Sequence, residues 1–202
     1  MRIKKFAILD YGIGNFGSLK GMLNKIGHNV YIGNNYKDLE KADFLILPGV
    51  GAFPSAINII KKNHLDKSLR KLKTQSKPML GICLGMHLLT TSSEELGLNK
   101  GLSFIPGKTK QNLKKAHHIG WSKLNFIDKK NDFFKFDDTD FYFLHMYSYN
   151  GPKNTHIAYA NFDKNKVASI IQKKNIVGVQ FHPEKSQDNG LEFFKKYIDV
   201  FK

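Results

Sequence analysis

The chain has 202 residues, a formal net charge of +15, 41% apolar residues and one cysteine. This length suits one ordinary hydrophobic core, so we expect a single domain over residues 1–202. A lone cysteine excludes an intrachain disulfide and favours a reducing, cytoplasmic setting. The first ten residues do not have the pattern of a secretory signal, and no apolar run approaches the roughly 20 residues of a membrane helix. We therefore expect no membrane partner.

The positive charge comes from lysines that are spread along the whole chain. They form isolated pairs and not one basic patch: Lys61-Lys62, Lys114-Lys115, Lys129-Lys130 and Lys173-Lys174. No nucleic-acid-binding module and no alternation of basic with aromatic residues accompanies them. The charge therefore predicts a solvated basic surface and no nucleic-acid partner.

Short apolar strands alternate with amphipathic helices in the first half of the chain. The pattern predicts strands over 6–9, 28–32, 44–47 and 78–82 and helices over 18–26 and 56–72. A strand, a glycine turn and a helix form the opening unit of an open α/β sheet. The turn glycines Gly12, Gly14 and Gly17 do not match a dinucleotide fingerprint, because the third comes one residue early and no acid ends the next strand.

The second half is less regular and richer in aromatic residues. Short strands are expected over 141–145, 167–172 and 176–181, followed by a last helix over 190–201. The helical spacing predicts that this helix faces inward with Leu191, Phe194, Ile198 and Phe201.

The only cysteine follows the apolar run 78–82 and precedes a helix-like segment. Gly81 and Gly85 flank Cys83 two residues away on each side, which is the cysteine version of the nucleophile elbow. A sharp strand-to-helix turn lifts the sulfur out of the sheet and places backbone N–H groups beside it. A buried free cysteine in a core strand explains this pentapeptide equally well.

His182-Pro183-Glu184 follows another apolar strand and is the second chemical signal. Residues two apart on an extended segment project to the same side, so His182 can face Cys83 while Glu184 orients the imidazole. An isolated His-Pro-Glu is more often a surface turn. Combined with the elbow, however, a thiol, a base and an acid that each end a strand indicate acyl transfer through a thioester.

These motifs resemble the triad-type, class I glutamine amidotransferases, and more narrowly the glutaminase subunits of imidazole glycerol phosphate synthase. The matching segments run from end to end: 10–15 with Ser18, 47–53, 81–85, 93–95, 118–121, 142–145 and 180–186. The resemblance implies an α/β fold with an open, mixed, mostly parallel sheet flanked by helices and short antiparallel strands in the second half. It implies no cofactor and no metal.

The family resemblance also assigns roles. Cys83 would attack the carboxamide of glutamine, His182 would act as base and then acid, and Glu184 would orient His182. The oxyanion would be held by the N–H of Leu84 and by a strand that contains Gly49, Val50 and Gly51. Glutamine would be bound by four further positions: His87, Glu95, Met146 and Tyr147.

Three further positions match the interface with a (β/α)₈-barrel cyclase that receives the ammonia: Asn15, Tyr142 and Lys185. Without the resemblance, a turn residue, a core aromatic and a surface charge would explain them as well. The expected complex is a heterodimer of this chain with the barrel subunit.

Four positions depart from the usual pattern of the family. His87 replaces a glutamine, His117 a proline, Ser122 an asparagine, and Met146 a serine or threonine. His87 and Met146 belong to the expected glutamine pocket. Three alternatives stay open: a paralogous glutaminase that supplies ammonia for amidination of a surface sugar, an inactive scaffold that binds the barrel, and a free-standing cysteine hydrolase.

Overall fold

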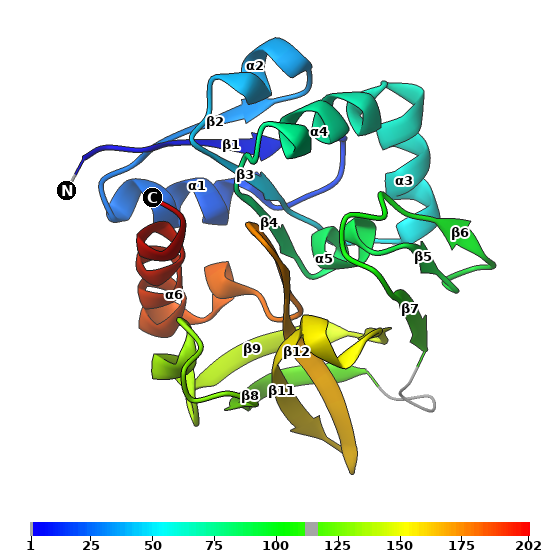
Figure 1. Ribbon diagram of the computed structural model, residues 1–202, viewed down its shortest axis with the longest axis vertical. Coiled ribbons are helices and arrows are strands. Elements are labelled where there is room, and N and C mark those ends of the chain that lie inside the picture. Colours follow the sequence, from blue (N-terminus) through cyan, green and yellow to red (C-terminus); the bar gives the residue numbers. More distant parts are fainter. Residues whose placement is uncertain (1, 112–116) are drawn as a thin grey trace.

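The structure is a computed structural model that describes residues 2–111 and 117–202, so the Lys114-Lys115 pair lies outside the described part (Figure 1). The larger sheet has the strand order β2-β1-β3-β4-β13-β12-β11-β8-β9. Its strands are β1 (Lys5–Leu9), β2 (Asn29–Gly33), β3 (Phe44–Leu47), β4 (Met79–Ile82), β8 (His118–Phe126), β9 (Asp140–His145), β11 (His156–Phe162), β12 (Asn165–Lys173) and β13 (Ile176–Val179).

The sheet is parallel from β2 to β13 and antiparallel from β12 to β9. A smaller sheet has the order β10-β7-β5-β6. Its strands are β5 (Ser92–Ser93), β6 (Asn99–Lys100), β7 (Lys108–Gln111) and β10 (Tyr147–Asn150). The expected open, mixed α/β sheet with antiparallel strands in the second half is therefore confirmed.

Helices cover both faces of the parallel half of the sheet (Figure 1). Side chains of α1 (Phe16–Lys25) and α6 (Gln187–Phe201) share one core cluster. The other core cluster contains side chains of α2 (Tyr36–Glu40), α3 (Phe53–Lys62), α4 (Leu65–Thr74) and α5 (Leu84–Leu89). Three short 3₁₀ turns, Phe134–Phe136, Lys153–Thr155 and Pro183–Lys185, complete the elements.

The structure corrects three sequence-based expectations about the helices. The single helix expected over 56–72 is two helices, because His64 adopts a left-handed backbone with φ of 55°. The one-and-a-half turns of α2 were not expected, since five residues carry little periodicity. In α6 the buried positions include Phe193 and Tyr197, whereas Leu191 and Phe201 are half-buried.

Parallel pairing of β4 with β13 sets the place of the site. Ile82 lies opposite Val179, so the residues after both strands meet at the same edge of the sheet. The chain after β13 is tied to β9 by a bridge between Phe181 and Phe143. Two segments far apart in sequence, 83–87 and 180–184, are thereby brought side by side.

Two glycines let α5 pack directly on the sheet. A Cβ at Gly85 would lie far inside van der Waals contact of the Leu47 carbonyl oxygen at the end of β3. A Cβ at Gly81 would come within 2.6 Å of the backbone of Gly85. The spacing of the elbow glycines is therefore required by the close passage of backbone over backbone.

Among the described residues, the helices are all too short or too polar to cross a membrane.

We predict that Gly85→Ala lowers the free energy of unfolding by about 3 kcal/mol or more, because α5 must move away from β3. Gly21 on α1 is a matched control, since a Cβ there meets nothing within 4 Å. Gly21→Ala should raise the free energy of unfolding by about 0.5–1 kcal/mol. Urea denaturation of both variants measures the two changes, and an equal effect of both would contradict the packing argument.

Candidate active site

Cys83 occupies the turn between β4 and α5. Its backbone has φ of 50° and ψ of −105°, a conformation that residues other than glycine rarely adopt. Its N–H donates to the carbonyl oxygen of Val179 at 2.8 Å, which fixes the turn to β13. The side chain is 7% exposed, so the sulfur is shielded from bulk solvent. This local geometry is the one expected of a nucleophile elbow.

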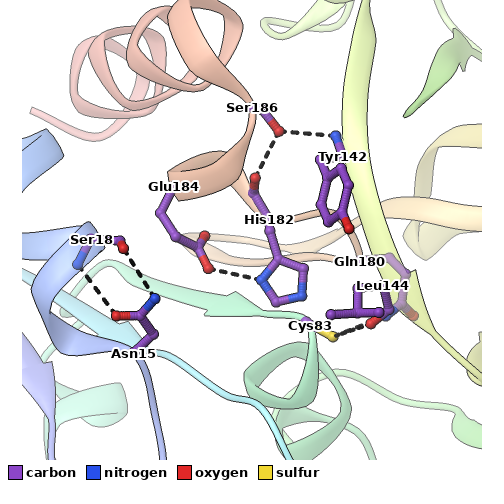
Figure 2. A network of polar contacts seen from close by, with 9 residues as sticks. All are labelled: Asn15, Ser18, Cys83, Tyr142, Leu144, Gln180, His182, Glu184 and Ser186. Atoms are coloured by element: carbon purple, nitrogen blue, oxygen red, sulfur yellow. Dashed lines mark hydrogen bonds and ion pairs between the residues drawn. The ribbon is translucent and has the colours of Figure 1, made fainter. Parts of the chain in front are cut away.

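His182 and Glu184 form a buried pair beside the cysteine (Figure 2). Nδ1 of His182 lies 2.8 Å from Oε1 of Glu184, and their side chains are 1% and 5% exposed. The backbone between them is not extended as expected, because residues Pro183–Lys185 form a 3₁₀ turn. Proline at the first position of that turn suits its fixed φ, and the turn brings the carboxylate back to the imidazole.

The imidazole of His182 lies between Glu184 and the sulfur of Cys83 (Figure 2). Within the described residues Nε2 of His182 makes no hydrogen bond, which leaves this nitrogen free to exchange a proton. Burial disfavours the imidazolium, but Cys83 and the Glu184 carboxylate outweigh burial and raise the pKa of His182 to about 10. This balance stabilises the imidazolium that forms when His182 takes the proton of the thiol.

Two further groups contact the sulfur. The thiol of Cys83 donates to the carbonyl oxygen of Leu144 at 3.6 Å, and the side-chain amide of Gln180 donates to the sulfur at 3.7 Å. Gln180 was not expected among the site residues, although a polar residue inside the apolar run 176–181 was an available signal. Its amide oxygen lies 2.8 Å from Nε2 of His87.

A cavity of about 150 Å³ opens beside the sulfur. At roughly 30 Å³ for each water, this volume is that of a small molecule and not of a macromolecular ligand. The lining residues are Val50, Gly51, Cys83, Leu84, His87, Glu95, Leu144, His145 and Met146. The fold thus brings together most of the residues that were expected to hold glutamine and its oxyanion. Tyr147 does not line the cavity.

Glu95 is half-buried at the wall of this cavity. Burial raises the pKa of its carboxyl, although the backbone amide of Phe53 acts in the opposite direction. An anionic carboxylate in a partly dry site gains a strong attraction to a cationic ligand group. The position therefore suits the amino group of an amino acid.

Residues 49–51, the candidate oxyanion segment, are irregular backbone after β3 and not the strand that was expected, and they lie against the start of α5. A Cβ at Gly49 would come within 2.6 Å of the Leu84 Cβ and within 3.0 Å of the Gly85 nitrogen, so the two segments are in close contact. The hydroxyl of Tyr11 donates to the carbonyl oxygen of Pro48 and anchors the start of this segment. Beyond it, Val50 is 38% exposed and Gly51 has φ of 109°.

A chain of hydrogen bonds with one direction lies behind the cavity. His145 lines the cavity, and its Nδ1 lies 3.0 Å from the Tyr147 carbonyl oxygen, which can only accept. Its Nε2 therefore accepts from Nδ1 of His118 at 3.0 Å. Nε2 of His118 in turn accepts from the hydroxyl of Ser122 at 2.8 Å. Ser122, one of the four departures, thus satisfies a buried histidine.

Burial keeps the linked histidines neutral. It lowers the pKa of His118 to about 4 and holds the pKa of His145 well below its usual value, with His118 adding to the effect. The ring of His118 is stacked between Phe143 and Phe162, with centroid distances of 4.5 and 4.2 Å.

The three positions expected at a partner interface come from three parts of the fold: the residue before α1, strand β9 and the 3₁₀ turn Pro183–Lys185. Asn15 is the N-cap of α1 and binds Ser18 through its side chain. Tyr142 is half-buried, with its ring edge-on to Trp121 at 6.0 Å and Nζ of Lys185 at 5.8 Å from its centroid. Trp121 is 46% exposed and extends this aromatic surface, although the sequence-based list of interface residues did not include it.

Comparison with known proteins agrees with this geometry. The family model "Glutamine amidotransferase class-I" matches residues 7–199. Two relatives are named imidazole glycerol phosphate synthase subunit HisH 2, from Vibrio vulnificus (42% identity, 98% of this chain and 95% of the relative) and Methanococcus maripaludis (44%, 95% and 98%). Subunit HisH of Lactococcus lactis is 36% identical over 98% of this chain and 99% of its own.

Among solved structures, PurLQS from Thermotoga maritima matches with a TM-score of 0.80 at 16% identity over all of both chains. A glutamine amidotransferase of the same organism matches with a TM-score of 0.68 at 16% identity, over 100% of this chain and 83% of the other. These likenesses concern the fold. The chain belongs to the class I glutamine amidotransferase family, whose members are enzymes, and within it the relatives above carry the name HisH.

The neutral histidines predict a loss of stability in acid. A histidine whose folded pKa lies near 4 binds fewer protons when folded than when unfolded, so stability falls as pH drops from about 6.5 towards 4. His118→Gln removes one such group. Near pH 5 it should reduce the slope of unfolding free energy against pH by about 1.4 kcal/mol per pH unit.

Urea denaturation at several pH values measures that slope, independently of any constant change in stability. An unchanged slope would mean that His118 is protonated in the folded protein.

Proposed function

We propose that the chain is the glutaminase subunit of an imidazole glycerol phosphate synthase, with Cys83, His182 and Glu184 as its catalytic residues. The observation that carries the proposal is the meeting of these side chains beside a cavity of about 150 Å³ at the ends of two adjacent parallel strands. The family membership and relatives of 36–44% identity support it.

The chemistry begins at the thiol. His182 takes the proton of Cys83, and the sulfur attacks the carboxamide carbon of glutamine to give a tetrahedral oxyanion. The N–H of Leu84 and an N–H of residues 49–51 stabilise that oxyanion. The C–N bond then breaks, His182 returns the proton to the leaving nitrogen, and ammonia departs from a thioester.

Water completes the cycle. His182 takes a proton from the water as the oxygen attacks the thioester, the C–S bond breaks, and glutamate leaves with the thiol restored. Glu184 holds the imidazole through Nδ1 and stabilises each imidazolium that forms. Glu95 faces the cavity and pairs with the amino group of glutamine, while His87 and Met146 line its walls.

We further propose that the ammonia passes to a (β/α)₈-barrel cyclase bound over Asn15, Tyr142 and Lys185. The exposed Trp121 beside Tyr142 supports a protein contact there, because large aromatic residues are enriched at interfaces. The chain would act as one domain in a heterodimer, and its single thiol suits a reducing cytoplasm.

A second candidate function is ammonia supply for another acceptor, such as a surface sugar that becomes amidinated. Two relatives carry the name HisH 2. The His87 and Met146 departures lie in the cavity and leave the triad in place. Co-purification of the barrel partner from the native host distinguishes the two acceptors.

We predict that Cys83→Ala abolishes glutamine-dependent synthesis by the complex, because no other thiol can form the thioester. Synthesis from added ammonium salts should persist, since the chemistry of the partner is untouched. Product formation with each nitrogen source measures both activities. Glutamine-dependent turnover by the variant would refute the assignment of the nucleophile.

Control by the partner is expected at the candidate oxyanion segment, residues 49–51. Loss of one oxyanion donor costs roughly 10²–10³ in rate, so an isolated chain with that donor turned away should hydrolyse glutamine at least about 10²-fold more slowly than the complex with acceptor bound. Gly51→Val should reduce this ratio, because Gly51 has φ of 109° and a valine there hinders reorientation. Steady-state glutaminase rates of chain and complex test this, and full activity of the chain alone would favour a free-standing hydrolase.

A further inference from the structure

A buried contact joins His87 to the nucleophile through one intermediate side chain. Nε2 of His87 lies 2.8 Å from Oε1 of Gln180, and Nε2 of Gln180 donates to the sulfur of Cys83 at 3.7 Å. His87 is 4% exposed and Gln180 is fully buried. His87 lies on α5, which follows the elbow, and Gln180 comes directly after β13, the strand that pairs with β4.

The donors and acceptors of the two hydrogen bonds from His87 through Gln180 to Cys83 follow from the chemistry of the three side chains. Burial keeps His87 neutral by lowering its pKa to about 4, although the contact with Gln180 acts the other way. Because the amide oxygen of Gln180 can only accept, Nε2 of His87 carries the proton and donates it. The amide is thereby held with its NH₂ towards the sulfur. The opposite orientation would place the amide oxygen against a thiolate.

The contacts of the sulfur differ in which form of Cys83 they favour. The carbonyl oxygen of Leu144 accepts from the thiol and repels a thiolate. The amide of Gln180 donates, so its interaction strengthens when the sulfur becomes negative. The balance between the two contacts depends on the orientation of Gln180, and that orientation depends on His87.

We propose that Gln180 is a catalytic residue that stabilises the Cys83 thiolate and that His87 is a positioning residue that fixes the Gln180 amide. The inference rests on the proposed function only for its effect on glutamine turnover. The effect on the thiolate is a property of the resting chain. His87 therefore acts on the nucleophile before any substrate arrives, in addition to lining the cavity.

The test is the pH dependence of the rate at which iodoacetamide alkylates Cys83 in the full-length chain without glutamine. Cys83 is the only cysteine of the chain, so the label reports this sulfur alone. Gln180→Met and His87→Leu should each move the midpoint of the profile upward by about one pH unit, the usual effect of losing a hydrogen bond to a charged group. His87→Gln, which retains an N–H donor, should leave the midpoint near that of the unmodified chain.

Other titrating neighbours of the sulfur stay in place in each variant: His182 with Glu184, His145, Glu95 and Tyr11. Ser169→Ala is the matched control, because Ser169 is buried on β12 and its carbonyl oxygen accepts from the backbone N–H of Gln180, while its hydroxyl binds Val167. This control should not move the midpoint. The double variant His87→Leu/Gln180→Met should match Gln180→Met alone, because one residue acts through the other.

Glutamine kinetics of the complex provide the second readout. We expect kcat to fall about tenfold in Gln180→Met with little change in KM. An unchanged alkylation midpoint in His87→Leu together with a raised KM would overturn the proposal and make His87 a substrate ligand only. Additive shifts in the double variant would overturn it as well.

If His87→Leu does not fold, Gln180→Met and His87→Gln still decide the role of the amide. Failure of the proposed function would appear differently, as a shifted alkylation profile without any glutaminase activity.

Discussion

The close passage of α5 over the end of β3 is the constraint on which the site depends. Gly85 lies against the Leu47 carbonyl, and Gly49 lies against the Leu84 side chain, so the nucleophile turn and the candidate oxyanion segment are held at contact distance. Neither approach tolerates a Cβ. The strained backbone of Cys83 is stable only because the elements on both sides of it are packed in this way.

Around that constraint, the polar groups of the site are held mostly by the backbone of the sheet. The backbone of His182 donates to Tyr142 on β9, and the hydroxyl of Ser186 links the His182 carbonyl to the Tyr142 N–H (Figure 2). The antiparallel half of the sheet therefore supports the base, and the parallel half supports the nucleophile. The relative positions of Cys83 and His182 therefore depend on both halves of the sheet.

The structural features that depend on short segments could be predicted from the sequence. Gly81, Cys83 and Gly85 indicate the elbow once they are combined with His182-Pro183-Glu184, and the apolar runs indicate the strands that precede Cys83 and His182. The 3₁₀ turn that carries Glu184 was read as extended backbone, because period-two spacing does not distinguish a strand end from a proline-initiated turn. The contact of Gln180 with the sulfur and the His118–His145 pair could not be predicted, since they depend on the register of strands paired over long distances.

The position of β13 has a consequence for how the protein is assembled. This strand is the last in the sequence, yet it pairs between β4 and β12 in the interior of the sheet. Until it arrives, β4 is an unpaired sheet edge, and the sulfur lies 97 positions from the amide that contacts it. A growing chain consequently carries a complete elbow but no base beside it until His182 has been added. The thiol gains its base and its amide partner only when β13 is inserted between β4 and β12, because that insertion places His182 and Gln180 beside the elbow.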